Sequence, residues 1–222
     1  MHGYLADKRT FTYQLKFFER NFDVFAFDLK GFGQNAGMEK PYSLDDYILE
    51  VEEYKYKNSI KSPNVIAHSF GGRISLKATA NDNSFCSKLV LTGCAGLKPK
   101  FSLKKFLNKS AFNFLKNFIK KEKLSMFYSK DYNSLSPVMK ESFKKIVNEH
   151  LDYTLPKINN QTLIIFGKND KETPLYMAKR LNEGIKNSTL RVILDAGHFC
   201  FIDKPYEFNY ITKEFLLTKK GE

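Results

Sequence analysis

Three side chains in this sequence could together form an activated nucleophile: a serine, an aspartate and a histidine. Ser69 follows the short apolar run 65–67 and is followed closely by Gly71 and Gly72. A strand, a sharp turn and a helix with serine at the apex would lift the hydroxyl off the end of a sheet, where amides at the helix start can face negative charge. The stretch matches the G-x-S-x-G nucleophile elbow, with Ala67 at the first glycine position.

A serine hydroxyl is a poor nucleophile until a base removes its proton, and that base needs an orienting acid. Among the four histidines, His198 follows the last predicted strand in a glycine-flanked loop, where it could swing over the elbow. His68 adjoins the serine on the opposite face of its strand, so we interpret it as structural or pocket-lining. His2 lies in the opening loop, and His150 lies in a helical segment.

The candidate acid is Asp170, which follows a predicted strand and precedes a predicted helix. Active groups of open parallel sheets gather at the carboxyl ends of the strands, where Ser69, Asp170 and His198 are all expected. The chain order Ser, Asp, His is that of one particular hydrolase class. Asp195 remains the alternative acid, although it lies at a strand end and close to His198 in the sequence.

A nucleophilic serine also requires donors for the oxyanion that its attack creates. The backbone N–H of Phe70 directly follows the nucleophile and is one expected donor. Tyr4, directly after His2-Gly3 in the early loop, is expected to supply the other from its backbone N–H.

Hydrophobic periodicity predicts strands that alternate with helices along the chain. Ser43, with Asp46 three residues later, reads as a helix start, and Thr173 is expected to cap a helix whose first residue is Pro174. This alternation predicts an α/β protein with a mostly parallel sheet covered by helices on both faces. The expected strands are 24–29, 64–68, 88–93, 162–166 and 190–194, and the expected helices are 11–20, 43–56, 73–80, 142–150, 174–184 and 205–217.

The segment 98–156 differs from its surroundings because it is rich in lysine and phenylalanine and poor in strand-like runs. Apolar side chains at 107, 111, 114, 115 and 118 fall on one side of a helix. We therefore interpret 98–156 as a helical lid inserted into a core formed by 1–97 and 157–222. The basic, amphipathic stretch 101–119 could alternatively rest on an anionic membrane surface.

Composition is that of an ordinary globular protein of 222 residues, with 42% hydrophobic and 27% charged residues. The formal net charge is +12, but the basic residues are spread out and no nucleic-acid recognition motif occurs, so a small-molecule substrate is expected rather than nucleic acid. Three cysteines without metal-like spacing suit a reducing compartment. No secretory signal or membrane-spanning apolar run occurs, and we expect a cytoplasmic protein.

Taken together, these motifs resemble the α/β-hydrolase fold superfamily, in the group with a helical cap. The resemblance implies a serine hydrolase that cleaves an ester, amide or related bond, or sometimes a carbon–carbon bond, of a small, partly apolar substrate through an acyl-enzyme. It implies no metal or organic cofactor. An acyltransferase and a non-catalytic binding protein of the same fold are the alternatives. The matching pieces are His2-Gly3, the loop 28–33, the elbow 67–72, the acid loop 167–174 and Gly197-His198-Phe199.

One feature departs from that family pattern: Met1 directly precedes His2-Gly3, where family members carry one or more strands. A central strand beside the elbow strand is therefore expected to be missing, which would leave a slot in the sheet. Met1 is either an internal methionine of a longer chain or the start of a shortened copy. In both cases we expect lower stability than in a complete relative, because ladder hydrogen bonds and core contacts are missing.

Overall fold

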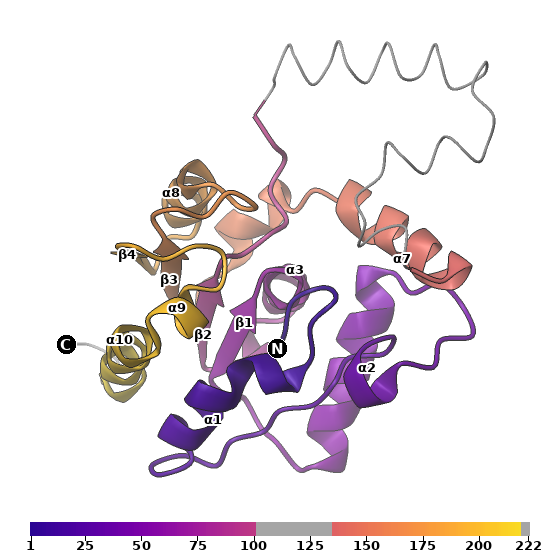
Figure 1. The fold of residues 1–222 in the computed structure, drawn as a ribbon, viewed down its shortest axis with the longest axis horizontal. Coiled ribbons are helices and arrows are strands. Elements are labelled where there is room, and N and C mark those ends of the chain that lie inside the picture. Colours follow the sequence, from indigo (N-terminus) through magenta and orange to yellow (C-terminus); the bar gives the residue numbers. More distant parts are fainter. Residues whose placement is uncertain (101–134, 219–222) are drawn as a thin grey trace.

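A parallel sheet organises the protein. The computed structural model describes residues 1–100 and 135–218, and within them four strands have the spatial order β1-β2-β3-β4 (Figure 1). The register aligns Ile66 with Val90 and Val90 with Leu163, so all carboxyl ends lie at one edge. The strands are β1 (Val65–His68), β2 (Lys88–Thr92), β3 (Gln161–Gly167) and β4 (Ser188–Ile193).

Helices cover both faces of this sheet, as the sequence predicts (Figure 1). On β2, Leu89 and Leu91 join one buried cluster and Val90 joins the other, because successive strand residues point to opposite faces. The first cluster contains side chains of α2 (Leu44–Lys57), α3 (Phe70–Asn81), α7 (Pro137–Asn148) and α8 (Leu175–Gly184), and α1 (Thr12–Phe18), α9 (Cys200–Asp203) and α10 (Pro205–Leu217) contribute to the second. Short 3-10 helices span Lys8–Phe11, Gly33–Asn35, Asn83–Phe85 and Asp152–Lys157.

Some helix starts agree with the sequence and others differ. Helix α10 begins at Pro205 as predicted, whereas α3 begins at Phe70 rather than at 73. Ser43 caps α2 in a reciprocal capping box with Asp46, as predicted. The prediction that Thr173 caps α8 was wrong, because its hydroxyl donates instead to Asp170 and the helix begins one residue later, at Leu175. Helix α7 begins at Pro137, with Ser136 as its cap, rather than at 142.

The strand predicted over 24–29 is not formed. Parallel strands need a neighbour for their ladder bonds, and on this side of β1 the described chain supplies only Met1, which bonds to Ile66 and His68. The segment instead reaches the N-terminus through a side chain: the Leu29 N–H donates to His2 Nε2 at 3.0 Å. Val24 and Phe25 remain exposed.

Two further expectations fall outside the described residues. These are the amphipathic helix around 107–118 and the proposed membrane-facing stretch 101–119. None of the described helices is long and apolar enough to cross a membrane.

Helix α3, which begins directly after Ser69, is held in its first turn by two other segments of the chain. At its start, the Gly71 N–H donates to the His2 carbonyl at 3.1 Å, and a Cβ built on Gly71 would lie 2.6 Å from the Met1 carbonyl oxygen. Farther along, the buried Arg73 guanidinium donates to the carbonyls of Ile146 and Glu149, at the end of α7. The elbow helix is therefore packed directly against both the N-terminal segment and α7.

We expect Gly71→Ala to lower the free energy of unfolding by about 1–3 kcal/mol, because the new methyl group would overlap backbone atoms that cannot rotate away. Urea unfolding followed by circular dichroism measures this. Gly37→Ala is the matched control, since a Cβ at Gly37 meets nothing within 4 Å. Equal stabilities of the two variants would contradict the close packing at the elbow.

Candidate active site

Ser69 stands at the turn between β1 and α3 in a strained conformation. Its φ is 48° and its ψ is −104°, a region that non-glycine residues seldom adopt. Three backbone hydrogen bonds hold it there: its N–H donates to Thr92, and its carbonyl accepts from Arg73 and Ala95. The predicted elbow is thus formed, and the surrounding backbone maintains its strain.

Asp170 and His198, which follow β3 and β4, form a hydrogen-bonded pair in which the carboxylate is buried and the imidazole is half-buried. His198 Nδ1 lies 2.9 Å from Asp170 Oδ2, and the Asp170 side chain has 0% exposure. An ionised carboxylate can only accept, so Nδ1 carries the proton and Nε2 is left as a base. Gly93, with φ of 49°, lets the ring approach, because a Cβ there would lie 3.0 Å from His198 Nδ1.

Thr173 completes the surroundings of this carboxylate. Its hydroxyl donates to Asp170 Oδ2 at 2.8 Å and its amide to Oδ1 at 2.8 Å, while the Glu172 amide donates to Oδ1 at 2.9 Å. Burial alone would raise the pKa of the Asp170 carboxyl, but these hydrogen bonds and the one from His198 hold the pKa below its ordinary value. The carboxylate therefore stays ionised at neutral pH. Thr173 was expected only as a helix cap, although an Asp-x-x-Thr spacing after a strand could have suggested this role.

His68 holds the loop that carries His198. Its Nε2 lies 3.1 Å from the His198 carbonyl, and the two rings are 4.6 Å apart. Burial, and secondarily the neighbouring His198, lowers the pKa of His68 to about 3. The ring is therefore neutral at physiological pH, with Nε2–H donating to the carbonyl. The structural reading of His68 agrees with these contacts.

The loop that carries Tyr4 lies against the elbow. A Cβ built on Gly3 would touch Ser69 Cβ at 3.4 Å and would lie only 2.8 Å from His68 Nδ1, so the His68 ring leaves no room for a larger residue there. His2 fixes this loop: its Nδ1 donates to the Gly3 carbonyl at 2.8 Å, and its Nε2 accepts from Leu29. Phe70 is the first residue of α3, so its N–H has no acceptor within the helix.

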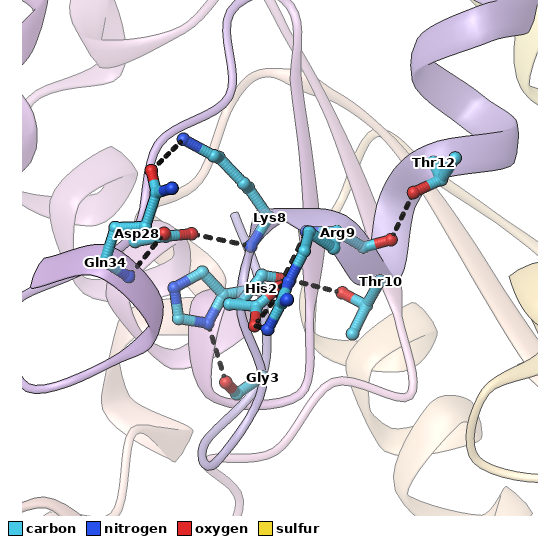
Figure 2. Close-up of polar contacts among 9 residues, drawn as sticks. His2, Gly3, Lys8, Arg9, Thr10, Thr12, Asp28 and Gln34 are labelled. Carbon is cyan, nitrogen blue, oxygen red and sulfur yellow. Dashed lines mark hydrogen bonds and ion pairs between the residues drawn. The ribbon is translucent and has the colours of Figure 1, made fainter. Parts of the chain in front are cut away.

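A buried carboxylate, Asp28, ties this loop to its neighbours. Figure 2 shows it between the Lys8 amide, which donates to Oδ1 at 2.8 Å, and the Gln34 amide, which donates to Oδ2 at 2.9 Å. Burial would raise the pKa of Asp28, but these amide bonds hold the pKa below its ordinary value. Asp28 belongs to the family-like loop 28–33, but this role was not expected from the sequence.

The structure brings some of the predicted site residues together and leaves others apart. Asp170 and His198 are bonded, and Ser69 adjoins His68, whose ring contacts His198. Among the residues that the structure describes, Ser69 Oγ makes no hydrogen bond to His198. Asp195, the alternative acid, is exposed in the turn after β4, and His150 is exposed after α7.

An aromatic cluster borders the Tyr4 loop. The Tyr4 ring packs edge-on against three phenylalanines, Phe32, Phe70 and Phe143, at centroid distances of 4.9, 5.4 and 5.1 Å. Its hydroxyl donates to the Met139 carbonyl at 3.1 Å. Because Met139 and Phe143 belong to α7, this helix packs over the loop next to Ser69.

Comparison with known proteins relates this arrangement to a large group of enzymes. The chain is 23% identical to the AB hydrolase superfamily protein YisY of Bacillus subtilis (strain 168), over 97% of this chain and 89% of that protein. It is 23% identical to a 2-hydroxy-6-oxo-6-(2'-aminophenyl)hexa-2,4-dienoic acid hydrolase of Metapseudomonas resinovorans, over 89% and 74%. The structure superposes on an esterase (EaEST) from Exiguobacterium antarcticum with a TM-score of 0.77, at 24% identity over 98% of this chain and 90% of that one.

The family model of the alpha/beta hydrolase fold matches residues 1–120 and 120–205, which together span most of the chain. Ser69, Asp170 and His198 follow one another along the chain in the order that the resemblance implies. The chain therefore belongs to the alpha/beta hydrolase fold family, a family of hydrolases.

Proposed function

We propose that the protein is a serine hydrolase that cleaves an ester, amide or related bond through an acyl-enzyme, with Ser69 as nucleophile, His198 as base and Asp170 as the orienting acid. The observation that carries this proposal is the 2.9 Å bond between His198 and Asp170 at the edge of the sheet where Ser69 stands in its strained turn. Strain at a half-buried serine is the kind of outlier that points to function.

The mechanism follows from these groups. His198 Nε2 removes the proton of the Ser69 hydroxyl, which attacks the substrate carbonyl. Asp170 keeps the imidazole in its Nδ1–H form and stabilises the cation that results. The N–H groups of Phe70 and Tyr4 receive the oxyanion. His198 then protonates the leaving group, and water repeats the sequence on the acyl-enzyme. In unliganded active sites, the hydrogen bond between nucleophile and base is often long, and it shortens only when substrate binds.

The aromatic cluster beside Tyr4 supports a partly apolar substrate. Rings of Tyr4, Phe32, Phe70 and Phe143 give an apolar wall next to the oxyanion donors. We therefore propose a small, partly apolar substrate, with the segment 98–156, to which α7 belongs, as a lid. The three free, buried cysteines support a reducing, cytoplasmic setting.

Replacing the nucleophile is the direct test. We expect Ser69→Ala to lower the turnover of p-nitrophenyl acetate and butyrate by about a millionfold, because no other hydroxyl stands at the elbow. Ser87→Ala, which removes an exposed hydroxyl, is the matched control and should retain full turnover. A fluorophosphonate probe should label Ser69, as read by peptide mass spectrometry. Undiminished turnover by Ser69→Ala, or no labelling of the folded protein, would favour a non-catalytic binding protein.

The identity of the acid has its own test. We expect Asp170→Asn to lower kcat by about 10⁴-fold, because an amide can donate to Nδ1 and so favours the wrong tautomer of His198. Asp195→Asn makes the same chemical change at the exposed alternative acid and should leave kcat unchanged. Initial rates with p-nitrophenyl butyrate separate the two. The reverse pattern would assign the acid to Asp195.

A further inference from the structure

The imidazole of His198 has a neighbour that the proposed mechanism does not use, the ring of Phe199. The centroids of these two rings are 5.4 Å apart, and the ring planes meet at 83°. The Phe199 ring also lies 4.8 Å from the ring of His68. A nearly perpendicular arrangement sets the edge of one ring against the face of the other, which is a favourable contact. Phe199 is therefore in direct contact with the proposed base.

Phe199 is exposed, whereas the aromatic rings around it are buried. It is 39% exposed, while His68 is 1% exposed and Phe201, two residues later, is fully buried. The Phe201 ring contacts the His68 ring at 4.9 Å and stacks on the Phe11 ring at 4.6 Å. Phe201 thus supplies the apolar packing between this loop and the core. An aromatic ring at position 199 adds little to that packing and keeps part of its surface open to solvent.

The proposed mechanism defines which part of a substrate would meet this ring. His198 Nε2 protonates the leaving group, so the leaving atom must come within hydrogen-bond distance of the imidazole. The group attached to that atom then lies beside the imidazole. Two rings of the described chain contact the His198 imidazole, those of His68 and Phe199, and His68 is buried. Phe199 is therefore the one of these two rings that a leaving group could touch.

We propose that Phe199 is a specificity-determining residue that selects an apolar, ring-sized leaving group, such as the alcohol part of an aromatic ester. This role depends on the proposed serine hydrolase function and extends it to the leaving group, because the aromatic cluster at Tyr4 borders the oxyanion donors instead. A phenyl side chain has no hydrogen-bonding group, so it favours a ligand through apolar and ring-to-ring contact. A ring-sized leaving group would cover the open part of Phe199 and remove its apolar surface from water.

Two acetate esters test the proposal because they share an acyl group and differ in the alcohol. Benzyl acetate and ethyl acetate form the same acetyl-enzyme, and their alcohols have similar acidity, so both make similar demands on His198 as an acid. We expect the kcat/KM of the unmodified protein for benzyl acetate to exceed that for ethyl acetate by at least about tenfold. Initial rates of acid release, followed in a pH-stat, give both values.

Variants at position 199 assign this preference to the ring. Phe199→Ala should lower the ratio of the two kcat/KM values by at least about fivefold, because the benzyl group loses a contact that the ethyl group does not make. Phe199→Tyr keeps the ring and should keep the ratio. Tyr206→Ala removes a 78% exposed ring at the start of α10 and is the matched control, which should also keep the ratio. The ratio does not depend on how much of a variant is folded. If Phe199→Ala does not fold at all, Phe199→Leu replaces it, with an expected loss of at least about twofold.

Several outcomes would overturn this role of Phe199. Equal kcat/KM values for the two esters, or an equal loss for both in Phe199→Ala, would mean that the ring only supports His198 by packing. An equal effect of Tyr206→Ala would show that the preference does not arise at position 199. If the protein hydrolyses p-nitrophenyl butyrate but not benzyl acetate, the leaving-group preference alone fails. If it hydrolyses none of these esters and the fluorophosphonate probe does not label Ser69, the proposed function fails as well.

Discussion

Two backbone hydrogen bonds, from His68 to Met1 and from Gly71 to His2, hold the N-terminal residues against the elbow on either side of Ser69. These bonds attach His68, which precedes the strained serine, and Gly71, which follows it, to the same short segment, residues 1–2. The same segment continues into Gly3 and Tyr4, so the nucleophile and one of its proposed oxyanion donors share a common support. The spacing of the site thus depends on backbone contacts that no side chain could replace.

Buried polar groups maintain the rest of the site, and both of its buried carboxylates are satisfied by specific partners. Asp170 accepts from His198, from Thr173 and from the Glu172 amide, and Asp28 accepts from two loop amides. Both carboxylates therefore remain ionised although they are buried. His68, by contrast, is kept neutral, which avoids placing a second positive charge beside His198 when that ring becomes protonated. Burial and hydrogen bonding thus keep the Asp170 carboxylate ionised and the neighbouring His68 ring neutral.

Most of the fold and of the candidate site could be predicted from the sequence, because local signals there agree with the tertiary structure. The apolar run before Ser69, the Ser43 capping box and the strand ends before Asp170 and His198 are all local. The failures have non-local causes. Residues 24–29 have strand-like composition, but a strand also needs a neighbour. Thr173 has a cap-like position, but its hydroxyl is bonded to Asp170. The roles of His68 and Asp28 depend on contacts between distant loops.

The link between Arg73 and α7 has a mechanical consequence. Arg73 lies one helical turn from Ser69 and holds the carbonyls of Ile146 and Glu149, while Lys77 on the next turn pairs with the Glu149 carboxylate. The C-terminal end of α7 is therefore pinned to the elbow helix. The first turn of the same helix is held as well, because the Tyr4 hydroxyl donates to the Met139 carbonyl. Helix α7 therefore bridges the helix of the nucleophile and the loop of the second proposed oxyanion donor, so a shift of either one is transmitted to the other.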